Sequence, residues 1–139
     1  MSQLRIEQLA GQLKQSLAPV YFIYGDETLL VNECADAIRR TARAQEYSDR
    51  QVFTVEAGFD WNSLLSASDS LSLFAERRIL ELRLPTGKPG KEGTRILREY
   101  AERPPEDTLL LIVSAKLESA ARRSKWVQAL DKAGVVVPV

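Results

Sequence analysis

The chain has 139 residues, which is enough for one ordinary globular domain and short for two. Apolar residues make up 45% and charged residues 27%, a balance that excludes a disordered or collagen-like chain. Basic and acidic residues both number 19, so the net charge is zero and no overall electrostatic field would hold a polyanion such as DNA.

The chain has one cysteine, Cys34, and no histidine. This excludes an internal disulfide and the usual zinc and Cys/His catalytic sets, and the position of Cys34 on an apolar helix face favours core packing. An acid, Glu7, lies near the start, and no apolar run has the length of a signal peptide or a membrane span. We therefore expect a cytoplasmic protein with no cofactor, no metal and no membrane association.

The spacing of apolar residues predicts the helices and the strand at the start of the chain. Leucines about one helical turn apart predict an amphipathic helix that ends at Pro19; they are Leu4, Leu9, Leu13 and Leu17. The apolar run over residues 20–24, stopped by Gly25, is typical of a strand covered on both faces. A long helix is then predicted to end before Tyr47, with one face formed by Leu30, Cys34, Ala37, Ile38 and Thr41.

The rest of the chain continues the alternation of strands and helices. Asp60 is predicted to cap a helix, and a loop with three glycines is predicted over residues 85–93. Further strands are predicted over residues 51–55, 78–84, 109–113 and 135–137. Further helices are predicted around Ile96, Leu97 and Tyr100, and over residues 119–132. The pattern predicts an α/β domain, a three-layer sandwich with a five-stranded, mostly parallel sheet.

The turn after the first strand is the first place to look for a ligand in such a fold. A phosphate-binding loop starting at Gly25 would need Gly-Lys-Ser/Thr at residues 30–32, where this chain has Leu-Val-Asn. The acids at 26–27 lie where phosphate would bind, and the fourth strand is followed by Ser-Ala-Lys at 114–116 instead of acids. The sequence therefore predicts no functional nucleotide site.

Two other candidate sites have weaker support. The acids at 26–27 are similar to the magnesium-binding pair of receiver domains, but the third strand ends in Leu84-Pro85 and not in an aspartate, so a helix N-cap is favoured. Basic clusters at residues 39–43 and 122–125 could form a basic face, although solvated helix surface is the favoured interpretation.

One apolar cluster lies in an otherwise polar connection. Leu71, Leu73 and Phe74 are surrounded by serines, an aspartate and an arginine pair within residues 66–78. Such a cluster either fills the domain's own core or is offered to a partner, and composition alone favours the core. If it is offered, burial of Leu73 and Phe74 would contribute roughly 1.5 to 3 kcal/mol each.

Several short motifs resemble, in order, the δ subunit of the bacterial DNA polymerase III clamp loader. They are Glu7-Gln8-Leu9, the turn at 24–30, Asp60-Trp61-Asn62, residues 71–75, residues 107–113 and Lys125-Trp126. Ser72-Leu73-Phe74 is the most specific of them. Leu71 stands where some members have methionine, a volume-conserving change.

The resemblance implies that residues 1–139 form the first, AAA+-like domain of a longer subunit, with a P-loop-NTPase-like fold and without its C-terminal domains. It implies a non-catalytic component of the polymerase holoenzyme, a nucleotidyltransferase. Leu71, Ser72, Leu73 and Phe74 would bind the β sliding clamp and help to open the ring. Other partners would be the γ/τ and δ′ subunits, with DNA contacted indirectly. The alternative is a nucleotide-dependent switch or receiver-like signalling domain on the same fold.

Overall fold

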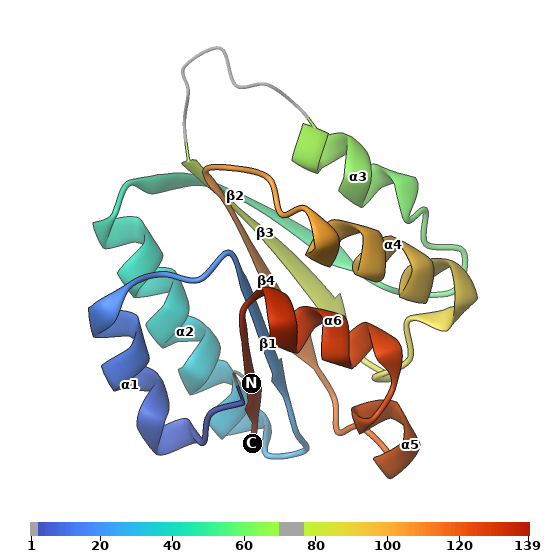
Figure 1. The fold of residues 1–139 in the computed structure, drawn as a ribbon, viewed down its shortest axis with the longest axis horizontal. Coiled ribbons are helices and arrows are strands. Elements are labelled where there is room, and N and C mark those ends of the chain that lie inside the picture. The colour runs from blue at the N-terminus through green and yellow to red at the C-terminus, as the bar shows by residue number, and fades with distance from the viewer. Residues whose placement is uncertain (1–2, 70–76) are drawn as a thin grey trace.

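A computed structural model describes residues 3–69 and 77–139. Its centre is one sheet of five strands in the order β2-β3-β4-β1-β5 (Figure 1). The strands are β1 (Val20–Tyr24), β2 (Tyr47–Thr54), β3 (Arg77–Leu84), β4 (Thr108–Ser114) and β5 (Val135–Pro138). All neighbouring strands pair in parallel. The α/β prediction is therefore confirmed, and the sheet is wholly rather than mostly parallel.

Helices cover both faces of the sheet and make three layers. The helices are α1 (Ile6–Gln15), α2 (Thr28–Ala44), α3 (Asn62–Asp69), α4 (Gly90–Glu102), α5 (Ser119–Arg122) and α6 (Lys125–Ala133). Helices α1 and α2 lie on one face, and α3, α4 and α6 lie on the other (Figure 1). Among the described residues, no helix is both long enough and apolar enough to cross a bilayer.

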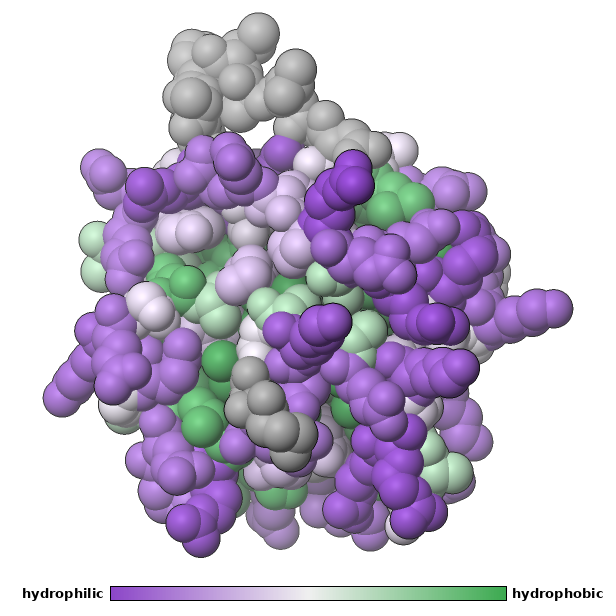
Figure 2. Space-filling view, viewed as in Figure 1, coloured by the Kyte–Doolittle hydropathy of each residue, from purple (hydrophilic) through white to green (hydrophobic). Residues whose placement is uncertain are grey.

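Strand β1 shows why its sequence is apolar without interruption. Tyr21 and Ile23 pack in the core beneath α1 and α2, whereas Val20, Phe22 and Tyr24 pack against the helices of the other face. All five residues of the strand are buried. A central parallel strand needs apolar side chains in both directions because helices cover both of its faces. By contrast, the molecular surface seen in Figure 2 is mainly hydrophilic.

Three element boundaries differ from the predictions. The helix predicted over 119–132 is divided into α5 and α6, and the Ser124 hydroxyl donates a hydrogen bond of 2.5 Å to the Ala121 carbonyl at the division. Strand β2 begins at Tyr47 and not at Gln51. Helix α4 begins at Gly90, inside the predicted loop. Short polar side chains compete locally for backbone hydrogen bonds, which apolar spacing does not reveal.

The buried face of α2 differs from the predicted one at three positions. Its buried residues are Val31, Cys34, Ala35, Ile38 and Ala42. Ala37 and Thr41 are only partly buried and Leu30 is 37% exposed. The helix begins at Thr28, and its contact stripe then runs through positions 31, 34, 35 and 38, at the usual spacing of three and four residues. Cys34 is confirmed as a core residue, and burial raises the pKa of its thiol.

Gly93 lets helix α4 approach Trp61. A Cβ atom at position 93 would lie 2.3 Å from Cζ2 of Trp61, which is itself buried and packs edge-on against Phe59 at 5.2 Å between ring centroids. We expect Gly93→Ala to lower the free energy of unfolding by about 1 to 3 kcal/mol through overpacking, despite the higher helix propensity of alanine. Urea unfolding measures the change.

The matched control is Gly11→Ala in α1, where nothing lies within 4 Å of the added methyl group. Here the substitution is expected to leave stability unchanged or raise it by up to about 1 kcal/mol. Equal effects at the two positions would contradict the packing explanation for Gly93.

Candidate partner-binding site

The residues predicted to bind a partner are Leu71, Ser72, Leu73 and Phe74, and they lie outside the described part of the chain. The structure describes the elements on either side of them in the sequence. Helix α3 ends at Asp69, and β3 begins at Arg77. The geometry of these two elements shows what holds the ends of the connection.

Helix α3 is held against the domain from its first turn. The Asp60 carboxylate accepts a hydrogen bond of 3.0 Å from the backbone N–H of Asn62, and the Ser63 hydroxyl donates to the Asp60 carbonyl at 2.6 Å. Leu64 is fully buried in the core shared with α4, as is nearly all of Trp61. The predicted capping role of Asp60 is confirmed, and it places α3 beside the sheet.

The start of β3 is held by two arginines. Arg77 donates from Nη1 to the Gln45 carbonyl at 2.8 Å, and its guanidinium carbon lies 5.8 Å from the centroid of the Tyr47 ring. Arg78 donates from Nη2 to the carbonyl of Ser68, near the end of α3, at 3.4 Å. This contact joins the two elements that flank residues 70–76. The end of α3 and the start of β3 are therefore held against each other.

A groove of about 710 Å³ lies at the carboxyl end of the sheet. The ends of β1, β3 and β4 and the start of α2 line it, which is where α/β sheets commonly bind ligands. Glu27 is the N-cap residue of α2, but its side chain makes no capping hydrogen bond. The acid predicted at this helix start is therefore present, whereas the side-chain cap is not.

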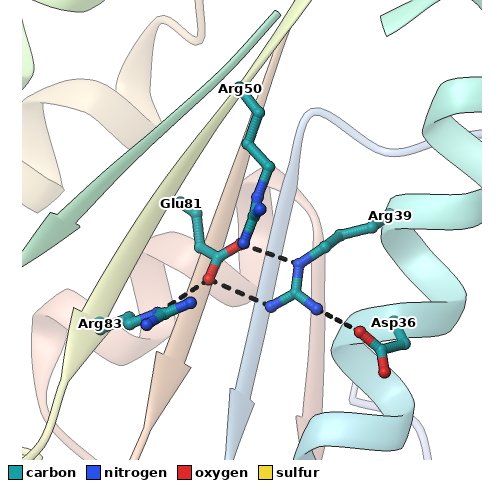
Figure 3. A network of polar contacts seen from close by, with 5 residues as sticks. All are labelled: Asp36, Arg39, Arg50, Glu81 and Arg83. Carbon is teal, nitrogen blue, oxygen red and sulfur yellow. Dashed lines mark hydrogen bonds and ion pairs between the residues drawn. The ribbon is translucent and has the colours of Figure 1, made fainter. Parts of the chain in front are cut away.

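A buried carboxylate, Glu81 of β3, borders this groove. Figure 3 shows the polar network around it. Its Oε1 accepts hydrogen bonds from Arg39 Nε at 2.8 Å and from Arg50 Nη2 and Nε at 2.9 and 3.1 Å. Its Oε2 accepts from Arg39 Nη2 at 3.1 Å and from Arg83 Nε at 3.0 Å. Arg39 also pairs with Asp36. The network therefore ties α2, β2 and β3 together.

The electrostatics of Glu81 reflect two opposing effects. Burial alone would raise its pKa, because a charged carboxylate loses its hydration. Hydrogen bonds from Arg39, Arg50 and Arg83 outweigh that effect and lower the pKa below its ordinary value. Glu81 is therefore a carboxylate at neutral pH, and its charge is matched inside the protein.

This network was not predicted from the sequence, and the predicted position of Arg39 on solvated helix surface is wrong. Arg39 was expected on solvated helix surface, but its side chain is 16% exposed and is paired with a buried acid. Arg40, Arg43 and the basic residues at 122–125 are exposed, as predicted. The available signal was Glu81 itself, a single acid between leucines in a strand covered on both faces.

The family of the chain is decided by comparison with known proteins. A family model described as DNA polymerase III, delta subunit, matches residues 21–139. The chain belongs to the DNA polymerase III delta subunit family. It is 34% identical to the delta subunit of Escherichia coli over 99% of this chain and 40% of that protein. It is 30% identical to the delta subunit of Haemophilus influenzae over 95% of this chain and 38% of that protein.

A solved delta structure agrees with the fold. The Bacillus subtilis DNA clamp loader delta protein superimposes with a TM-score of 0.74 and 26% identity, covering 96% of this chain and 42% of that one. The chain thus spans about two fifths of the length of these delta relatives. The family membership and the P-loop-like α/β fold predicted from the sequence are both confirmed.

Proposed function

We propose that this chain is the AAA+-like first domain of a clamp-loader delta subunit that binds the β sliding clamp and helps to open the ring for loading onto primed DNA. The binding element would be Leu71, Ser72, Leu73 and Phe74. Membership of the delta family is the observation that carries the proposal. The contact between Arg78 and Ser68 supports it, because firm ends reduce the entropy that the connection loses on binding.

The proposed mechanism needs no covalent chemistry. Two large apolar side chains entering a pocket contribute roughly 1.5 to 3 kcal/mol each, which is enough for a small hot-spot interface. A domain that binds the open ring more tightly than the closed ring shifts the ring toward opening by that difference in affinity. The apolar segment would anchor the clamp, and neighbouring contacts would favour the less curved protomer.

The division of labour in the loader is part of the same proposal. Residues 30–32 are Leu-Val-Asn in place of the Gly-Lys-Ser/Thr of a phosphate-binding loop, so ATP would act on other subunits. Domains beyond this chain would join it to the γ/τ and δ′ subunits, since the delta relatives are more than twice as long. DNA would be contacted through the assembled complex, and this domain would be non-catalytic.

A nucleotide-dependent switch is the second candidate, and the groove at the carboxyl end of the sheet is the observation that favours it. Calorimetry separates the two functions. Titration of the chain with the β clamp of the same organism is expected to show saturable binding, and titration with ATP and magnesium is expected to show none. Nucleotide binding without clamp binding would replace the first proposal by the second.

A further inference from the structure

The groove at the carboxyl end of the sheet lies at one end of β3. The strand begins at Arg77, the first described residue after residues 70–76, and ends at Leu84, which lines the groove. Eight residues of strand at roughly 3.3 Å each separate the two ends by about 25 Å. A ligand in the groove would therefore bind about one strand length away from Arg77.

Arg83 lines this groove. Its guanidinium is held in place by Glu81 and still has hydrogen-bond donors for a ligand. Its Nε is bound to Glu81 at 3.0 Å, and its side chain is 49% exposed. Within residues 3–69 and 77–139, its two terminal nitrogens have no hydrogen-bond partner. An anchored guanidinium loses little rotamer freedom when it binds a carboxylate, so the ion pair with Glu81 prepares Arg83 for a second acid.

Lys116 adds a second positive charge on the same rim. It lies two residues after the end of β4, is exposed, and has no ion pair in the part of the chain that the structure describes. Register places Arg83 beside Val113 of β4, three residues before Lys116. Glu81 is already saturated by its arginines, and Asp26 is the other acid lining the groove. An anionic ligand would therefore meet two cations on the β3–β4 side.

One exposed apolar side chain flanks the same groove. Thr28 and Val31 of α2 line the groove, and Leu29, which follows Thr28 in the first turn of the helix, is 71% exposed. Arginine is enriched in the surfaces through which proteins bind one another, and Arg83 keeps donors that a partner can use. Nucleic acid is disfavoured because the chain has no net positive charge, whereas binding to a phosphate backbone depends on many cations.

We propose that this groove docks an acidic segment of a partner protein, whose carboxylates pair with Arg83 and Lys116 and whose apolar side chain packs on Leu29. The inference goes beyond clamp binding and does not depend on it. Its occupant is a protein segment that combines carboxylates with leucine-like side chains.

The test uses a capped peptide of alternating glutamate and leucine as the probe, with the glutamine-for-glutamate version as its matched control. Nuclear magnetic resonance follows the Nε–Hε signal of Arg83 during the titration. The glutamate peptide is expected to shift that signal saturably, and the glutamine peptide is expected to bind about tenfold more weakly or not at all.

Two variants locate the binding. Lys116→Glu reverses a charge without touching the Glu81 network and is expected to weaken peptide binding about tenfold or more. Arg95→Gln is the control. Like Arg83, Arg95 is about half exposed and paired with glutamate, in this case with two glutamates, but it lies on α4, away from the groove. Both variants are expected to retain clamp binding, which separates this proposal from the proposed function.

Three outcomes would overturn the inference. They are no saturable shift with the glutamate peptide, equal binding by the Lys116→Glu variant and the unchanged chain, and tighter binding of a single-stranded oligonucleotide than of the peptide. The last outcome would assign the groove to nucleic acid.

Discussion

Replacing both Leu73 and Phe74 by alanine is expected to abolish measurable binding to the β sliding clamp. If each side chain contributes roughly 1.5 to 3 kcal/mol by burial in the partner, the double variant loses about 3 to 6 kcal/mol. That loss corresponds to a dissociation constant weaker by a factor of roughly 10² to 10⁴. Calorimetry on the unchanged chain and the variant measures the difference directly.

The control for this prediction has to separate a partner contact from a core contact. If Leu73 and Phe74 filled the domain's own core, the same substitutions would lower its stability by about 2 to 5 kcal/mol each. Thermal unfolding of the variant is therefore measured alongside binding. Leu29→Ala is a matched variant at an exposed leucine outside the segment and is expected to bind the clamp normally. Full clamp affinity in the double variant would reject the proposed binding element.

Removing the carboxylate of Glu81 is expected to lower the stability of the domain strongly. Glu81→Ala leaves Arg39, which is 16% exposed, without its main partner, whereas Arg50 and Arg83 are half exposed and can turn to water. Breaking a buried ion pair from one side typically costs 3 to 5 kcal/mol, and we expect about 3 kcal/mol here. Urea unfolding of the variant measures this loss.

The matched control is Glu99→Ala, which removes one exposed ion pair with Arg95 on α4. A surface pair of this kind is worth about 0 to 1 kcal/mol. If Glu81→Ala and Glu99→Ala lowered the free energy of unfolding by comparable amounts, the buried network would contribute no more to stability than an exposed ion pair.

Lowering the pH is expected to remove the contribution of Glu81 to the stability of the fold. Its pKa is lower in the folded state than in the unfolded chain, so its stabilisation is fully present above the unfolded pKa, about 4.3. As the pH falls from there through the depressed folded pKa, that stabilisation is lost. The stability difference between the unchanged chain and Glu81→Gln is therefore expected to be constant near neutrality and to shrink below about pH 4. A difference that grows on acidification would contradict the direction of the shift.

The parts of the fold that were predictable are those that local patterns determine. The continuous apolar runs of β1 and β4 were placed to within one residue, because a strand covered on both faces needs them. The Glu81 network was not predictable in the same way. Its partners come from positions 39 and 50 as well as from the same strand, and only the folded sheet brings them together. The assignment of Leu71, Ser72, Leu73 and Phe74 stays a prediction.

The pairing of β1 has a consequence for how the protein is made. Val20 pairs with Leu110 and Tyr21 with Val135, so this interior strand finds its two neighbours only in the last third of the described chain. During synthesis this strongly apolar strand leaves the ribosome long before either neighbour exists. Pairings so distant in sequence form slowly and leave intermediates prone to aggregation. Nascent chains are therefore expected to need chaperone protection until β5 has been released.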